Sequence, residues 1–245
     1  MRPILFQWHG LTIRSYHAMI YLGLLIGVAA GNFAAHASGL NALRTYVATM
    51  ILIGPGLLGA RLLHVALHWR LYRHNVRRIW NGSEGGGVQY GGVPVVLSLS
   101  VPVLWMLGLP LGAFWDVALF TFLVTVIFGR LGCLLNGCCS GRPSSCWISV
   151  SLPNASGTWE TRLPTQLLEA GWAAILLILA ASIWRWMPFP GALFLAITGC
   201  YAAGRIVFES TREFDPRAGR FNFNYGMSVM IVVLSLALLT AHWPR

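Results

Sequence analysis

Residues 129–142 read Gly-Arg-Leu-Gly-Cys-Leu-Leu-Asn-Gly-Cys-Cys-Ser-Gly-Arg and follow a nearly unbroken apolar run over residues 117–128. An arginine just beyond such a run lies where a membrane ends or a protein-lined cavity begins, and it needs an anionic partner. Four glycines in this stretch permit close backbone approach and sharp turns, so we expect the stretch to break the preceding helix. The pattern predicts a docking site for a negatively charged group.

The composition is that of an integral membrane protein. Of the 245 residues, 56% are hydrophobic and only 10% are charged, which excludes an ordinary soluble protein. The formal net charge of +10 comes from arginine alone, because the sequence contains no lysine. Arginine binds phosphate through two parallel hydrogen bonds, so this bias suits anionic lipid headgroups. A GC-rich genome explains the lack of lysine equally well.

Seven apolar segments are long enough to cross a membrane as helices. We expect them at residues 16–35, 45–66, 93–109, 112–128, 164–187, 191–208 and 225–241. Residues 1–245 are therefore predicted to form a single all-α membrane domain. Its small extramembrane head is expected at residues 142–163, which are polar by the standards of this chain.

Two segments between the second and third spans are predicted to lie at the membrane surface. Residues 68–81 mix arginines with aromatic residues, as an interfacial helix on anionic lipid does. Residues 82–92 are too rich in glycine to form a stable helix alone, and they predict a re-entrant or cavity-lining loop. Tyr90 in this loop is either an interfacial anchor or part of a site.

Charged residues near the span ends predict an anion-binding pocket. Arg205 lies four residues before Glu209, and Arg212 lies three after it, so a helix places all three on one face. Arg61 lies deep in the second span, where an unpaired arginine costs about 2.5–3.5 kcal/mol. Arg61, Arg130 and Arg205 therefore predict a pocket lined by three spans that receives a phosphate. A ladder of structural ion pairs explains the spacing of the last helix equally well.

Two further features leave alternatives open. Gln166 and Glu169 lie three residues apart, and they either orient a ligand or begin a solvated helix. Tyr16 opens the first span and would be an ordinary interface residue by itself.

The cysteines do not define a disulfide framework, because their number is odd. They are Cys133, Cys138, Cys139, Cys146 and Cys200. Cys138 and Cys139 are adjacent and would face differently on any regular element. A Cys-x4-Cys-Cys spacing without a nearby histidine also matches metal sites poorly. We therefore predict no metal and no cofactor, with the cysteines in packing or, for Cys138 and Cys139, in a reactive role.

Six motifs, taken in order along the chain, resemble those of bacterial prolipoprotein diacylglyceryl transferases. They are Arg14-Ser15-Tyr16, Gly59-Ala60-Arg61, Tyr90-Gly91-Gly92, Gly129-Arg130-Leu131-Gly132 with Asn136 and Gly141-Arg142, Pro164-Thr165-Gln166-Leu167-Leu168-Glu169, and Gly204-Arg205-Ile206-Val207-Phe208-Glu209. Several would be weak alone, but their common order over most of the chain is far more specific. The chain is thus identified as a divergent member of that family.

The resemblance implies a seven-span enzyme of the bacterial inner membrane with its active face in the periplasm. It would join the diacylglyceryl group of phosphatidylglycerol to the lipobox cysteine of a secreted precursor, releasing glycerol phosphate. A cationic clamp on the leaving phosphate and deprotonation of the incoming thiol both favour this reaction. The implied partners are phosphatidylglycerol or another anionic phospholipid, the lipobox precursor and the membrane, but no nucleic acid.

The resemblance also implies roles for individual residues. The implied catalytic residues are Tyr90, Arg130, Arg205 and Glu209. The implied substrate-binding residues are Tyr16, Arg61, Gly91, Gly92, Asn136, Gly141, Gln166, Glu169 and Arg212. In the implied orientation most arginines outside the spans face the periplasm, whereas the positive-inside rule alone would reverse the protein.

The chain departs from the family pattern at several positions, and three of them change side chains within the motifs above. Tyr90 stands where the family usually has histidine, Cys133 where it has asparagine, and Cys138 where it has glutamate. A tyrosine, with an ordinary pKa of about 10, is a poorer base at neutral pH than a histidine of about 6.5. Two alternatives therefore stay open. One is a paralogue with the same phospholipid clamp and a different acceptor or donor, and the other is a non-catalytic lipid-binding protein or small transporter.

Overall fold

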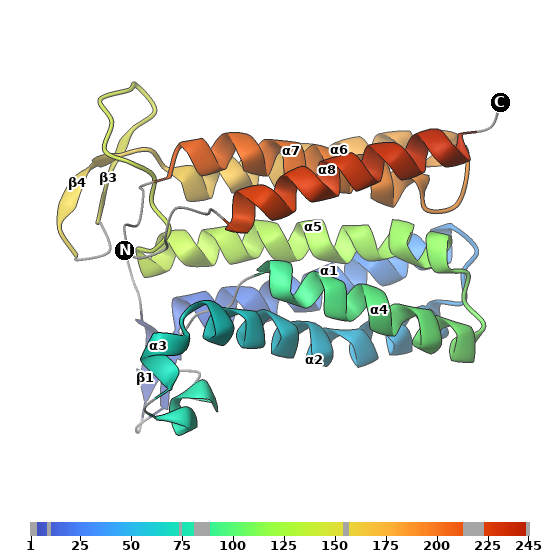
Figure 1. The fold of residues 1–245 in the computed structure, drawn as a ribbon, viewed down its shortest axis with the longest axis horizontal. Coiled ribbons are helices and arrows are strands. Elements are labelled where there is room, and N and C mark those ends of the chain that lie inside the picture. Colours follow the sequence, from blue (N-terminus) through green and yellow to red (C-terminus); the bar gives the residue numbers. More distant parts are fainter. Residues whose placement is uncertain are drawn as a thin grey trace. The chain divides into compact units, whose positions relative to one another are not determined.

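The computed structural model describes residues 4–8, 11–73, 75–80, 89–153, 157–212 and 223–243. Within these residues, seven helices are long and apolar enough to cross a membrane. They are α1 (Ser15–Ala37), α2 (Ala42–Leu67), α4 (Gln89–Leu107), α5 (Leu111–Asn136), α6 (Thr165–Ile183), α7 (Ala192–Ser210) and α8 (Phe223–His242) (Figure 1). The predicted all-α membrane protein with seven spans is confirmed.

The chain divides into two compact units. Unit 1 comprises Met1–Ala34 and Trp115–Arg245, and unit 2 comprises Ala35–Phe114. Most of α1 and α5 belongs to unit 1 together with α6, the short 3-10 helix η3 (Trp184–Trp186), α7 and α8. Unit 2 contains α2 and α4, with α3 (Trp69–Tyr72) and the 3-10 helix η1 (Val76–Trp80) between them. The single membrane domain expected from the sequence stays a prediction.

Three helices end at a glycine with left-handed backbone geometry. The φ angle is 78° at Gly39, 64° at Gly108 and 73° at Gly137, which glycine adopts without steric cost. After Gly137, the amide of Cys138 donates to the carbonyl of Cys133 at 3.1 Å, the long hydrogen bond of a Schellman motif. The sequence therefore ends α5 with a turn that folds the chain back on its last helical residues.

The glycine-rich end of α5 does not break where the sequence predicts. The helix continues through Gly129 and Gly132 to Asn136 and turns only at Gly137. The expected early break is wrong because the first two glycines serve helix packing instead of turning. A Cβ atom at Gly132 would lie only 3.0 Å from the Cβ of Met19 in α1.

Small residues bring α1 and α5 close together within unit 1. Gly23, Gly27 and Gly31 recur at every fourth residue of α1, and all three face α5. Thr121 of α5 donates to the carbonyl of Gly27 at 2.9 Å, and Thr125 donates to that of Gly23 at 3.3 Å. Such faces of small residues allow membrane helices to approach closely, since lipid supplies little hydrophobic drive for their association.

Helix α7 is held within unit 1 by hydrogen bonds from its first residues to α5 and by packing against its neighbouring helices. The carboxylate of Asp116 in α5 accepts hydrogen bonds from the amides of Gly191 (2.7 Å) and Phe194 (2.8 Å) at the start of α7. A negative charge at this position complements the positive end of the helix dipole. Helix α7 also packs against both α6 and α8.

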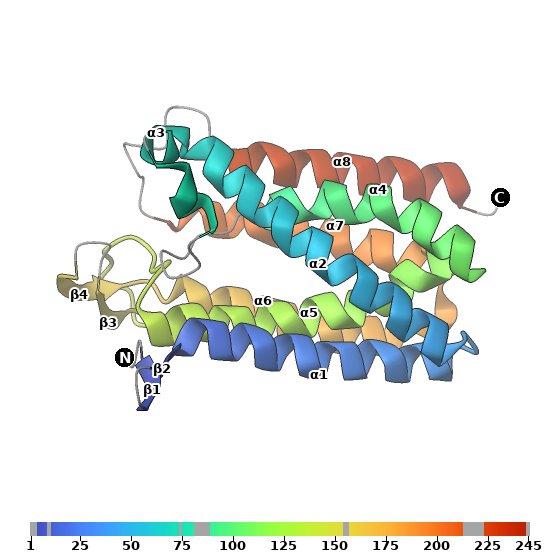
Figure 2. The same cartoon turned by 90° about the horizontal axis from the view of Figure 1, so that it is seen from below.

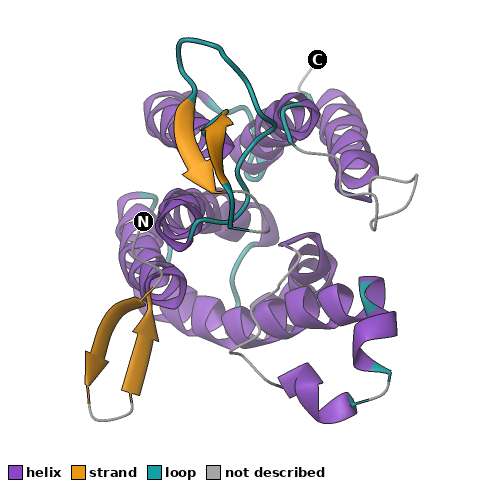
Figure 3. Ribbon diagram, turned by 90° about the vertical axis from the view of Figure 1, so that its left-hand side faces the viewer, coloured by secondary structure: helices purple, strands orange, loops and turns teal. Residues whose placement is uncertain are grey.

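Two β-hairpins lie at one end of unit 1, where α1 and α6 begin and α5 and α7 end (Figures 2 and 3). Strand β1 (Ile4–Trp8) pairs with β2 (Leu11–Arg14), and β3 (Val150–Pro153) pairs with β4 (Trp159–Arg162), both antiparallel. The second hairpin lies within the polar excursion expected at residues 142–163. Residues 154–156 of that excursion lie outside the described residues.

In unit 2, glycines on both helices let α2 and α4 approach closely. A Cβ atom at Gly59 would lie 2.7 Å from the carbonyl oxygen of Gly91, and one at Gly92 would lie 2.6 Å from that of Gly56. The expected loop is therefore wrong at its C-terminal end, because Gly91 and Gly92 belong to α4 and serve its packing. Residues 82–88 lie outside the described residues.

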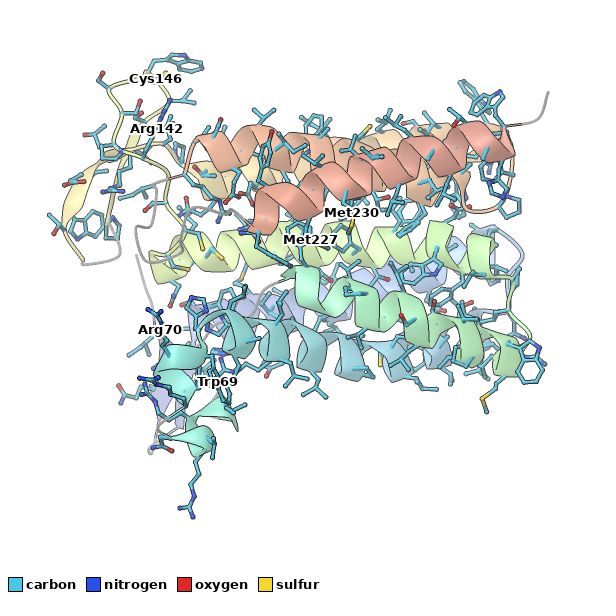
Figure 4. The ribbon with its side chains drawn as sticks, viewed as in Figure 1. Trp69, Arg70, Arg142, Cys146, Met227 and Met230 are labelled. Carbon is cyan, nitrogen blue, oxygen red and sulfur yellow. The ribbon has the colours of Figure 1, made fainter. Side chains whose placement is uncertain are left out.

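The interfacial helix expected over residues 68–81 is divided into α3 and η1. The chain turns between them, where the amide of Asn75 donates to the carbonyl of Tyr72 at 3.0 Å. A single helix is therefore wrong for this segment. Trp69 and Arg70 are both exposed on α3 (Figure 4).

Candidate active site

Glu169, one turn into α6, is the centre of a buried charge cluster in unit 1. Its side chain is 1% exposed, yet three arginines from other elements reach it. Nε of Arg130 in α5 lies 2.6 Å from Oε2, while Oε1 accepts from Nη1 of Arg205 at 2.6 Å and Nη2 of Arg212 at 2.7 Å. A carboxylate this buried is tolerated only when it is paired, so the three arginines hold it in place.

Glu209 adds a second carboxylate to this charge cluster. Its Oε2 lies 3.4 Å from Nη2 of Arg205 and 3.7 Å from Nε of Arg212, so the predicted proximity of the three side chains is confirmed. The predicted common helix is wrong for Arg212, because α7 ends at Ser210. Three arginines and two glutamates leave a formal charge of +1. A positive charge with little access to water favours the binding of an anion.

The three arginines differ in their access to solvent. The exposed fraction of the side chain is 7% for Arg205, 14% for Arg130 and 21% for Arg212. Arg205 and Arg212 each pair with both carboxylates, and Arg205 is the more buried of the two. Arg130 and Arg212 are the arginines that an anionic ligand reaches first.

Gln166 links the charge cluster to the end of α5. Its Nε2 donates to the carbonyl of Cys138 at 2.6 Å, whereas its Oε1 is buried without a hydrogen-bond partner among the described residues. Gln166 and Glu169 are both 1% exposed, so the alternative of a solvated helix start is wrong. The free oxygen marks a place where a bound group with a donor would be stabilised.

The segment that follows α5 ties the start of α6 to the end of α7. The amide of Gly141 donates to the carbonyl of Leu163 and that of Arg142 to the carbonyl of Thr211, both at 2.9 Å. Gly141 also forms an isolated β-bridge with Arg212. A Cβ atom at Gly141 would lie 2.9 Å from the Leu163 carbonyl, so a side chain there would force this segment apart.

Three cysteines gather beside the charge cluster. The Sγ atoms of Cys133, Cys138 and Cys139 all lie within 4.8 Å of one another. The expectation that the two adjacent cysteines face differently on a regular element does not apply, because neither lies on one and Cys139 has a left-handed φ of 62°. Hydrogen bonds from the other two thiols hold the pKa of the Cys139 thiol well below its usual range, and the charges of Arg212 and Arg130 act in the same direction.

Two predicted substrate-binding residues flank these groups. Tyr16 begins α1 and interacts electrostatically with Arg130 and Cys133. Asn136 is exposed at the end of α5, and its side chain influences the nearby thiol of Cys138. The structure therefore brings Tyr16 and Asn136 together with the charge cluster inside unit 1.

Arg61 and Tyr90 belong to unit 2. Nε of Arg61 donates to the carbonyl of Ile79 at 3.0 Å and Nη2 donates to that of Arg78 at 3.3 Å, while the guanidinium lies 5.6 Å from the centroid of the Tyr72 ring. Tyr90 is buried at the start of α4. The convergence of Arg61 with Arg130 and Arg205 stays a prediction.

The whole chain is similar to one family of membrane enzymes. The model of the prolipoprotein diacylglyceryl transferase family matches residues 3–241. The chain belongs to this family. Its similarity to individual members is moderate but extends over most of both chains.

Three relatives in the family show the extent of this similarity, and each is named a phosphatidylglycerol–prolipoprotein diacylglyceryl transferase. The protein of Dehalococcoides mccartyi is 29% identical over 222 residues, covering 87% of this chain and 83% of its own. That of Clostridium tetani is 29% identical over 224 residues, covering 89% and 87%. That of Clostridium kluyveri is 26% identical over 244 residues, covering 97% and 95%.

Two residues of this family member join the site without having been predicted. Tyr201 is buried one turn before Arg205 in α7, and its hydroxyl, which has no hydrogen-bond partner among the described residues, interacts electrostatically with Arg130. Its four-residue spacing from Arg205 could have revealed it. Arg162 is 1% exposed and donates to the Gly141 carbonyl at 3.1 Å. Nothing in its polar sequence context signals that burial.

Proposed function

We propose that this protein transfers the diacylglyceryl group of phosphatidylglycerol to the lipobox cysteine thiol of a secreted precursor. In this reaction the bond between a glyceryl carbon and a phosphate oxygen breaks, and a bond between that carbon and the thiol sulfur forms. The thiol loses its proton and glycerol phosphate leaves. The observation that carries the proposal is the +1 charge cluster around Glu169 in a chain of this family.

The charge cluster suits a phosphodiester in charge and in geometry. A phosphodiester carries one negative charge, which matches the +1 of the cluster, and its phosphate gains further negative charge as it leaves. Among the described residues, the ion pair of Arg130 uses Nε, which leaves its terminal Nη groups to donate to phosphate oxygens. Arg212 can donate hydrogen bonds to the phosphate from the more exposed side of the cluster. The ion pair of Arg205 with Glu209 helps to fix the positions of the arginines around Glu169.

The remaining predicted residues complete the proposed pocket. Tyr90 is proposed to meet the reacting carbon, and the excursion over residues 142–163 is proposed to guide the acceptor peptide. For Cys138 and Cys139, the two roles left open by the sequence, packing or reactivity, both stay predictions. The other residues proposed to shape the pocket are Tyr16, Arg61, Gly91, Gly92, Asn136, Gly141 and Gln166.

We place the protein in the bacterial inner membrane with the hairpin end of unit 1 toward the periplasm. A secreted precursor meets its modifying enzyme on that side. The described arginines at this end include Arg14, Arg142, Arg162 and Arg212, whereas Arg185 follows the far end of α6. An active face that collects anionic headgroups is basic for that reason, which offsets the positive-inside rule.

The direct test supplies purified protein with phosphatidylglycerol and a lipobox peptide, and measures the peptide mass and released glycerol phosphate. A thioether-linked diacylglyceryl peptide with glycerol phosphate in equal amount is the expected result. A peptide with serine in place of the acceptor cysteine, and phosphatidylcholine in place of phosphatidylglycerol, serve as controls without product.

Other outcomes point to the two alternatives. Release of glycerol phosphate without a modified peptide would indicate a different acceptor. Saturable binding of phosphatidylglycerol without turnover, beside an active family member, would indicate a lipid-binding protein. Either result would overturn the proposed transfer to a lipobox thiol.

Tyr90→His tests the main departure from the family pattern. An imidazole titrates near neutral pH and accepts a thiol proton more readily than a phenol does. We therefore expect this variant to transfer to the peptide faster than the wild type. An unchanged rate would show that Tyr90 does not limit the thiol step.

A further inference from the structure

We infer that Cys133, Cys138 and Cys139 form a binding site for one thiophilic divalent ion of the zinc class. Their three Sγ atoms converge at the end of α5, within 4.8 Å of one another. The sequence alone predicts no metal here, and the proposed transfer requires none. The inference therefore does not rest on the proposed function, although both draw on the charge of the cluster around Glu169.

The spacing of these three thiols is close to that of a metal centre. A zinc–sulfur bond is about 2.3 Å long, so sulfurs around one zinc ion lie roughly 3.7–4.0 Å apart. Side-chain rotations that move the sulfurs by less than about an ångström therefore close the site around an ion. Thiolate ligands select zinc and other soft ions over magnesium and calcium.

The backbone brings the three cysteines together without long-range packing. The Schellman hydrogen bond from Cys138 to Cys133 closes the end of α5 and places the two residues together. The left-handed conformation of Cys139 then turns its side chain toward the same point. A non-glycine residue is uncommon in this conformation, and such strain persists where the surroundings impose it.

The surrounding charges suit a divalent ion. Three thiolates with a divalent ion carry a net charge of −1, and the adjacent charge cluster carries +1. When no lipid phosphate is bound, the two groups together are neutral, which lowers the cost of burying the thiolates. Cys139 is exposed, so an ion enters from water, whereas Cys133 is buried.

The three-thiol group leaves room for one more ligand. Zinc binds four ligands, and among the described residues no histidine nitrogen or carboxylate oxygen belongs to this group. The fourth position is therefore open to water or to an external thiol. Binding would also fasten the end of α5 to the segment that leads to Gly141.

The test loads the reduced, full-length protein with Zn²⁺ in detergent, removes free metal and measures zinc per protein by mass spectrometry. One equivalent is expected for the wild type, with an ultraviolet thiolate-to-metal band when Cd²⁺ replaces Zn²⁺. Cys133→Ser, Cys138→Ser and Cys139→Ser are each expected to lose the bound ion. Cys146→Ser and Cys200→Ser are matched controls that keep it, because both cysteines are exposed outside the group (Figure 4 for Cys146).

A second measurement uses only the wild type, so misfolding of a variant cannot hide the answer. Cd²⁺ should protect Cys138 and Cys139, the two more accessible cysteines of the group, from maleimide, mapped by peptide mass, while the reaction of Cys146 and of Cys200 is the same with and without it. Zinc content equal to that of the triple Cys→Ser variant would overturn the inference. So would equal alkylation of Cys138 and Cys139 with and without Cd²⁺.

Discussion

The charge cluster and the three-thiol group lie side by side in unit 1 but are built in different ways. The charge cluster draws on α5, α6 and α7, whose charged residues meet only when the helices pack. The three-thiol group comes from residues 133–139 and is closed by a local turn. The charge cluster therefore depends on tertiary packing around the carboxylate of Glu169, whereas the three-thiol group depends on the backbone conformation of Gly137 and Cys139.

The largest expected effect comes from removing the centre of the charge cluster. Glu169→Gln keeps the size of the side chain but leaves three arginines around a neutral group. Loss of one partner of a buried ion pair destabilises a protein by about 3–5 kcal/mol, so we expect a large fall in the thermal unfolding temperature in detergent. Leu167→Ala, on an exposed position of the same helix, is the control with little effect. Equal stability of the two variants would contradict the central role of Glu169.

Arg212, the most exposed arginine of the charge cluster, should affect the transfer rate more than the stability of the protein. Arg212→Ala is expected to lower the transfer rate about 100-fold, the loss typical of removing one donor to a developing anion. Arg212→Lys should recover little of that rate, because an ammonium group lacks the two-pronged geometry of a guanidinium. Arg185→Ala, at an exposed arginine in η3 beyond the far end of α6, is expected to keep the wild-type rate in the same assay. Full activity of Arg212→Lys would show that only the positive charge at this position matters for transfer, and not the hydrogen-bonding geometry of the guanidinium.

The three-thiol group should be sensitive to backbone conformation instead. Gly137→Ala forces a side chain into a left-handed conformation, at a cost of about 1–2 kcal/mol, and should weaken zinc binding as the turn loosens. Gly171→Ala is the matched control, since a Cβ there meets nothing within 4 Å and alanine favours the helix. Zinc titration and thermal unfolding of both variants provide the measurement. Wild-type zinc affinity in Gly137→Ala would show that zinc binding by the three-thiol group does not depend on the turn at Gly137.

The smallest expected effect comes from the helix packing that supports both regions. Thr121→Val removes the hydrogen bond from α5 to the Gly27 carbonyl while keeping the shape of the side chain. Hydrogen bonds between membrane helices contribute about 0.6 kcal/mol on average, so we expect a shift of that order in unfolding free energy. Unfolding in a mixed-micelle titration measures it. A shift several times larger would mean that this contact controls the position of α5.

Most of the fold could be predicted because lipid demands long apolar helices. All seven spans were located, and their ends were predicted to within about four residues except the C-terminal end of α5, since hydropathy and length define them. The end of α5 was misjudged because a glycine within a helix has two uses that the sequence does not distinguish. Gly132 lets α1 approach, whereas Gly137 turns the chain.

The site could be predicted in part for a similar reason. The ion pairs of Arg205 with Glu209 follow from helical spacing, but the meeting of Arg130 and Arg212 on Glu169 requires the packing of three helices. The gathering of Cys138 and Cys139 depends on a left-handed residue that no pattern announces. Roles for individual residues in transfer stay predictions.

The most direct test compares transfer by the wild type and by Arg130→Ala in membranes of phosphatidylglycerol. The measurement is the mass of a lipobox peptide after incubation, with folded protein quantified by its monodisperse elution. We predict diacylglyceryl peptide from the wild type and none from Arg130→Ala. Equal product from both proteins would contradict the claim that the charge cluster around Glu169 binds the phosphate of the lipid.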